Sequence, residues 1–67
     1  MEYKITNIVL EGNRFRVFIE VNGIEENNLF MPDITSTEIR QWAEERALFY
    51  QELKEKEEEL KNELINL

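Results

Sequence analysis

The sequence predicts an α+β fold in which a three-stranded antiparallel β-meander packs against one long C-terminal α-helix. Three observations support this fold. Hydrophobic residues tend to alternate with polar ones before Pro32 and recur at a helical spacing after it. Asn22-Gly23 is the residue pair that favours a tight hairpin turn. Thr35 and Glu38 fit the capping box that begins many helices, and no Gly or Pro follows them.

The chain of 67 residues is expected to form a single domain. We place the β-meander in residues 1–32 and the helix in residues 35–66, with the C-terminal half of the helix projecting. A domain of this size buries only about 60% of the surface that its unfolded chain exposes. The chain has no cysteine for a disulfide and no histidine or cysteine for a zinc site. Association with another chain is therefore the expected source of extra stability.

The first two strands are expected in residues 3–10 and 14–21, which are rich in Ile, Val and Phe. Gly12 lies in the link between them and suits a tight turn. The third strand is expected in residues 24–31, although residues 25–28 are all polar. Pro32 ends it, because proline cannot donate a hydrogen bond to a sheet.

Tight turns in both hairpins fix which residues face each other. In that register Leu10 is opposite Phe15 and Thr6 is opposite Ile19, while Ile8 is opposite Val17 and Phe15 is opposite Phe30. The face expected to receive the helix carries Ile8, Leu10, Phe15, Val17, Ile19, Val21, Ile24 and Phe30. The opposite face is also partly apolar, and we regard it as a possible partner face formed by Tyr3, Ile5, Val9, Phe18, Leu29 and Met31.

The predicted helix is longer than the sheet beneath it. About 30 residues at 1.5 Å each span ~45 Å, whereas a strand of eight residues spans about 27 Å. Most apolar residues lie in the first half of the helix, including an aromatic cluster of Trp42, Phe49 and Tyr50 that is expected to pack on the sheet. Leucines at a seven-residue spacing continue into the second half as a weak heptad pattern. The expected oligomer interface consists of Leu53, Leu60, Leu64 and Leu67.

The composition argues against catalysis. Without histidine or cysteine the chain lacks the commonest general base and the thiol nucleophile, and its only serine, Ser36, lies in the capping region. We therefore expect no enzyme activity, no cofactor and no metal. No apolar run approaches the roughly 20 residues of a membrane span, and no signal peptide is evident, so a cytoplasmic location is expected.

The chain is acidic, with 15 Asp and Glu against 8 Lys and Arg and a formal net charge of −7. That field repels phosphate backbones, so direct binding to nucleic acid is not expected. A different possibility is an inhibitor whose carboxylates take the place of phosphates in a nucleic-acid site on a partner enzyme. Acidity for solubility alone is the simpler interpretation.

Turn and cap residues distributed along nearly the whole chain carry a family resemblance. They are Tyr3-Lys4-Ile5, Asn7-Ile8, Leu10, Gly12, Val21-Asn22-Gly23, Phe30, Pro32-Asp33, Thr35 and Glu38-Ile39. With these residues the chain resembles small proteins encoded by tailed bacteriophages and prophages. Residues 25–28 depart from the longer, more β-branched third strand of that group. The resemblance implies a viral accessory role and no catalytic residue.

The sequence thus favours a non-catalytic protein-interaction or structural accessory protein of phage origin. We expect it to form a homo-oligomer, dimer or higher, through its C-terminal helix, and a host or viral protein is a possible further partner. The acidic inhibitor is the alternative.

Overall fold

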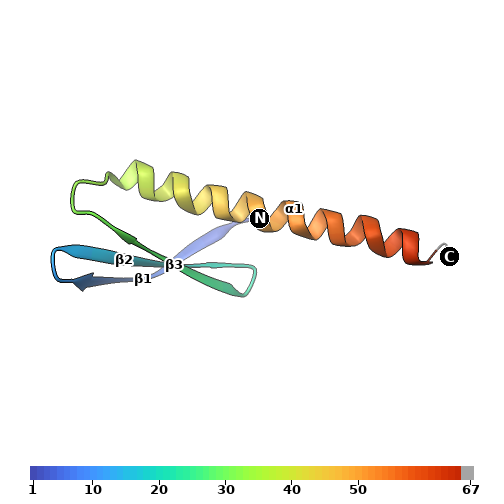
Figure 1. Ribbon diagram of the computed structural model, residues 1–67, viewed down its shortest axis with the longest axis horizontal. Helices are drawn as coiled ribbons and strands as arrows, with labels where there is room; N and C mark the ends of the chain where they lie inside the picture. Colours follow the sequence, from blue (N-terminus) through green and yellow to red (C-terminus); the bar gives the residue numbers. More distant parts are fainter. Residues whose placement is uncertain (66–67) are drawn as a thin grey trace.

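The computed structural model describes residues 1–65, with side chains through Leu64, as three strands followed by one helix. The elements are β1 (Tyr3–Glu11), β2 (Arg14–Val21), β3 (Ile24–Phe30) and α1 (Ser36–Ile65). The strands form one antiparallel sheet in the order β1-β2-β3. Helix α1 crosses one face of the sheet and extends well beyond it (Figure 1), so that the molecule measures 55 × 18 × 14 Å. The predicted α+β fold is confirmed.

Both turns need residues that tolerate a positive φ. Asn22 and Gly23 have φ values of 51° and 82°, which suit the type I′ turn expected for this pair. Gly12, in the other turn, has a φ of 63°. The third strand forms despite its polar residues, because it lies at the edge of the sheet, where polar side chains are tolerated.

The register of β1 on β2 contains a β-bulge near the start of the chain. The predicted pairs Leu10–Phe15 and Ile8–Val17 are present, as is the pair Phe15–Phe30 between β2 and β3. The predicted pair Thr6–Ile19 was wrong, because the register shifts between Ile5 and Asn7 and Ile5 pairs with Ile19 instead. An extra residue in one strand turns the side chains on its far side to the other face.

The bulge corrects two face assignments. Tyr3 pairs with Val21 and Ile5 pairs with Ile19, and both β2 residues are fully buried under the helix. Since directly opposed residues share a face, Tyr3 and Ile5 lie on the helix side of the sheet. Their predicted place on the outer face was therefore wrong.

The core lies between β2 and the first half of α1. Two buried alanines of the helix let it approach the sheet closely, and Phe30 packs edge-on against Trp42 with ring centroids 5.4 Å apart. The buried residues are Val17, Ile19, Val21, Phe30, Ala43 and Ala47. The expected packing of Trp42 and Tyr50 against the sheet is confirmed, since both lie against this core, whereas Phe49 stays exposed.

The helix covers only one diagonal of the sheet. It packs on the end of β3 through Trp42 and on the start of β1, where the Met1 amino group donates a hydrogen bond to Gln51. The two other corners stay open. Ile8 and Leu10, predicted to lie under the helix, are 60% and 81% exposed, and Ile24 at the start of β3 is also exposed. A straight helix on a twisted sheet cannot cover all four corners.

The predicted capping box begins the helix. The Thr35 hydroxyl oxygen accepts a hydrogen bond from the Glu38 N–H at 3.2 Å and lies 3.1 Å from the Glu38 carboxylate. The Ile39 N–H donates to the Thr35 carbonyl at 3.2 Å, which closes the first helical turn. Ile34 and Ile39 are half-buried against the core, as expected for a hydrophobic staple. These contacts confirm Thr35 as the N-cap.

Candidate interaction surface

The second half of α1 projects past the sheet. Every described side chain from Glu52 to Leu64 is exposed. Figure 1 shows this part of the helix continuing beyond the turn between β2 and β3. The predicted mismatch between helix and sheet is therefore present in the structure.

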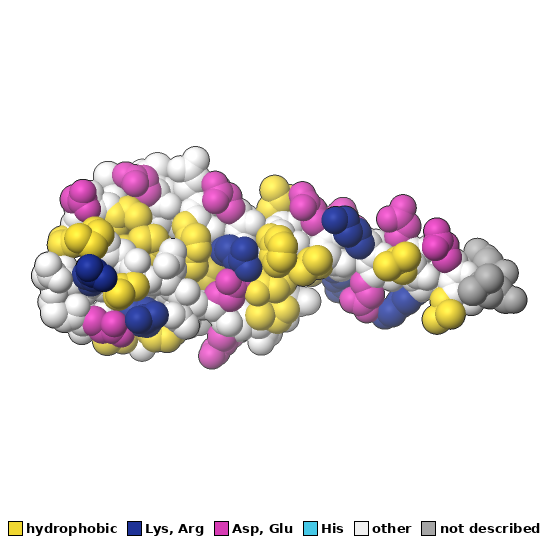
Figure 2. Space-filling view, viewed as in Figure 1, with side chains coloured by type: hydrophobic (Ala, Val, Ile, Leu, Met, Phe, Trp, Pro, Cys, Tyr) yellow, Lys and Arg dark blue, Asp and Glu magenta, His cyan; other side chains and the backbone are white. Residues whose placement is uncertain are grey.

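Three leucines lie on one face of the projecting helix. Leu53, Leu60 and Leu64 are 46%, 64% and 69% exposed. At 3.6 residues per turn their spacings of seven and four place them within about 40° of one another around the helix axis. We call Leu53, Leu60 and Leu64 the leucine stripe. Figure 2 shows hydrophobic side chains along this part of the helix, with charged ones between them. Leu67, the fourth predicted interface residue, lies outside the described residues.

One charged residue lies within the leucine stripe. Glu57 is four residues after Leu53 and forms an ion pair with Lys61 across one turn, with 2.6 Å between the Nζ and Oε1 atoms. The hydrogen bond from Lys61 lowers the pKa of Glu57, and the same bond raises the pKa of Lys61. Both groups are exposed, so the pair contributes little to stability. The lowered pKa does keep the Glu57 carboxylate ionised at its position between Leu53 and Leu60.

An ion pair fixes the helix to β3 just before the projection begins. The Arg46 Nε atom lies 3.0 and 3.1 Å from the two carboxylate oxygens of Glu26, and its guanidinium lies 4.5 Å from the ring centroid of Phe49. Partial desolvation acts to raise the pKa of Glu26, but the interactions with Tyr50 and Arg46 outweigh it and the pKa lies below its usual value. Arg46 precedes Leu53 by seven residues, so both point to the same side of the helix. That side is covered by β3 at Arg46 and is open from Leu53 onward.

A groove of about 340 Å³ lies where the helix leaves the sheet. It joins the open corner at Ile24 to the first residue of the leucine stripe, Leu53. Its lining consists of Met1, Asn22, Ile24, Tyr50, Leu53, Lys54 and Glu57. This groove was not predicted from the sequence, because Ile24 was expected under the helix. The apolar surface at the base of the projection is therefore wider than the stripe itself.

The outer face of the sheet is less continuous than predicted. Val9 and Leu29 lie on it, but Arg16 stands between them in the register and binds Glu11 at 2.8 Å and Asn27 at 2.7 Å. Phe18 has asparagines opposite it on both neighbouring strands, and Met31 lies beyond the end of β3. The structure thus separates the four outer residues of the predicted partner face and moves Tyr3 and Ile5 away from them.

The two sheet edges carry features that oppose strand pairing. On β1 the Asn7 side chain accepts a hydrogen bond from the Ile8 N–H at 2.9 Å, and on β3 the Asn28 side chain accepts one from the Leu29 N–H at the same distance. These side chains occupy donors that an added strand would need. The exposed Ile8 and Leu10 lie on the helix side of β1, near a smaller groove of about 200 Å³. We therefore rank the leucine stripe above the sheet edges as a candidate interface.

No metal-binding cluster was found in the described part of the chain: it holds no group of three or more Asp, Glu, His or Cys side chains placed to bind an ion. The same residues include no helix that is long and apolar enough to cross a membrane.

Comparison of the chain with models of protein families, with curated proteins and with solved structures found no match.

Proposed function

We propose that this protein is a non-catalytic interaction or structural accessory protein that self-associates through the leucine stripe of α1. One observation carries the proposal. Three exposed leucines share one face of a helical segment that extends beyond the cover of its own sheet. A second copy suits this surface because the stripe is narrow, apolar and spaced like the seam of a coiled coil, which is self-complementary.

A second copy would bury the exposed parts of six leucine side chains, three from each copy. Association costs translational and rotational freedom, so the dimer fraction should depend strongly on protein concentration. Burial of Ile24 in the adjoining groove would add apolar area to the contact.

We also propose a phage origin and a cytoplasmic location for this protein. The resemblance of the turn and cap residues to small phage and prophage proteins supports a viral accessory role, with a host or viral protein as a further partner. The acidic-inhibitor alternative receives less support, because Lys54, Lys56 and Lys61 interrupt the glutamates of the projecting helix.

The test is to replace two stripe residues by charged ones. Leu60→Glu together with Leu64→Glu should lower the oligomeric mass and the thermal midpoint together, since the stripe could no longer be buried. Leu48→Glu is the matched control, because Leu48 is an exposed leucine of the same helix that lies off the stripe. Light scattering after size exclusion measures the mass. An unchanged mass in the double variant would contradict the proposal.

A further inference from the structure

We propose that the two copies pair with their helices antiparallel, so that Leu53 of one copy lies opposite the partner's Leu64. This inference rests on the proposed self-association and specifies its geometry. Three independent features of the projecting helix lead to it: the position of Glu57, the charges beside the stripe, and the place of β3.

Glu57 disfavours a parallel pair. The stripe with Glu57 has spacings of four, three and four residues, which is the a and d pattern of a two-stranded coiled coil. In a parallel pair in register, identical residues share a layer, so two Glu57 carboxylates would meet at the seam. In the antiparallel pair Leu53 meets the partner's Leu64, and Glu57 meets the partner's Leu60. All leucines of the stripe are then used, and the two carboxylates are in different layers.

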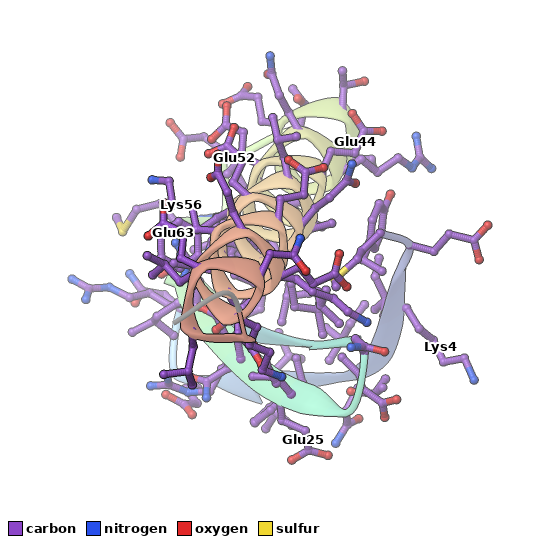
Figure 3. The ribbon with its side chains drawn as sticks, turned by 90° about the vertical axis from the view of Figure 1, so that its right-hand side faces the viewer. Lys4, Glu25, Glu44, Glu52, Lys56 and Glu63 are labelled. Carbon is purple, nitrogen blue, oxygen red and sulfur yellow. The ribbon has the colours of Figure 1, made fainter. Side chains whose placement is uncertain are left out.

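The charges on one flank of the stripe favour the same arrangement. Figure 3, viewed along the helix, shows Glu52, Lys56 and Glu63 on the same side of α1. A two-fold axis perpendicular to the helices brings like flanks together, and Lys56 then lies beside the partner's Glu63. In a parallel pair the two-fold axis runs along the helices and brings opposite flanks together. Lys56 would then lie beside the partner's Lys61. On this flank the antiparallel pair therefore gains two attractive contacts, whereas the parallel pair would have two repulsive ones.

The other flank offsets part of this gain. It carries Lys54 and Lys61, and the antiparallel pair brings Lys54 of one copy toward the partner's Lys61. Each Lys61 already has a carboxylate neighbour in Glu57, 2.6 Å away, and the partner's Glu57 comes to the same level of the helix pair. Two carboxylates thus lie among the four ammonium groups and reduce their repulsion.

The position of β3 limits where a second helix can lie. The side of α1 that carries the leucine stripe is covered at Arg46 by the ion pair with Glu26. Parallel partner helices would continue side by side past this point and would collide with β3. In the antiparallel pair the leucine stripes overlap over residues 53–64, about 18 Å at 1.5 Å per residue, and the two sheets lie at opposite ends. Two 55 Å molecules then form a dumbbell about 90 Å long.

A distance between spin labels tests the orientation. The chain has no cysteine, so Gln41→Cys provides one labelling site on an exposed position of the helix above the sheet. Pulsed electron paramagnetic resonance should give about 50 Å between the labels of an antiparallel pair. A distance of about 25 Å or less would overturn the antiparallel inference and leave self-association intact. The absence of any intermolecular distance, with a monomeric mass, would overturn both.

Charge reversal at Lys56 is a second test, because the two orientations predict opposite changes in the affinity of the dimer. Lys56→Glu should weaken the antiparallel dimer about tenfold, because two attractive contacts become repulsive. Adding Glu63→Lys should restore the affinity. In a parallel dimer Lys56→Glu would instead tighten binding, since the new carboxylate would lie beside the partner's Lys61. Lys4→Glu makes the same charge change on the sheet, away from the helix (Figure 3), and should leave the dissociation constant within about twofold.

Discussion

Two isoleucines on the same face of the sheet should differ sharply in their effect on stability. Ile19 is fully buried beneath α1, whereas Ile8, in the open corner, is 60% exposed. Ile19→Ala should lower the free energy of unfolding by about 2–5 kcal/mol, through lost burial and the cavity that remains. Ile8→Ala removes the same atoms but only the smaller, buried part of their transfer free energy, about 1 kcal/mol or less.

The size of the larger effect sets the design of the experiment. A domain of 67 residues has a total stability of roughly 3–10 kcal/mol. Ile19→Ala therefore removes a large part of it, and Ile19→Val, which costs about 0.5–1.5 kcal/mol, gives a variant that stays folded. Urea unfolding followed by far-ultraviolet circular dichroism, at one fixed chain concentration, gives the free energy of unfolding of each variant and of the unmutated protein.

The comparison tests how the helix lies on the sheet. Equal losses for Ile19→Ala and Ile8→Ala would mean that the helix covers the end of β1 as well as its start. The diagonal packing described above would then be refuted.

Three further predictions concern the ion pair, the cap and the acidic surface. Glu26→Gln should lower the free energy of unfolding by about 1 kcal/mol at pH 7. Because folding lowers the pKa of Glu26, this difference is present above the unfolded-state pKa and is lost as the pH falls through the folded-state pKa. The unfolding curves of the two proteins should therefore converge in acid. Thr35→Ala should cost about 1 kcal/mol by calorimetry, while Thr35→Ser keeps the capping hydroxyl and should cost much less. Glu55→Gln with Glu58→Gln should leave stability within about 0.5 kcal/mol and the oligomeric mass unchanged; loss of an inhibitory activity on a nucleic-acid enzyme in this variant would instead support the acidic-inhibitor alternative.

The features that follow from local chemistry could be predicted from the sequence. The turn at Asn22-Gly23 and the capping box at Thr35 depend on residues within one turn of the chain, and both are present. The projection of the helix followed from two lengths, the rise of a helix and the rise of a strand, and needed no knowledge of packing. The positions of Leu53, Leu60 and Leu64 on one face followed from the helical period.

The features that depend on how elements meet could not be predicted. The bulge at Thr6 arises in the pairing of β1 with β2, although one signal was available. Ile5 and Ile8 are three residues apart, and both can face the helix only if an extra residue lies between them. The diagonal path of α1, which exposes Leu10 and opens the groove at Ile24, results from sheet twist and has no local sequence signal.

Sedimentation equilibrium of the unmutated protein tests the central claim most directly. If the leucine stripe is buried against a second copy, the apparent mass should rise with concentration from 8.1 kDa toward twice that value. A mass that stays at 8.1 kDa up to millimolar concentration would show that the projecting helix remains uncovered in solution, and the proposed self-association would be wrong.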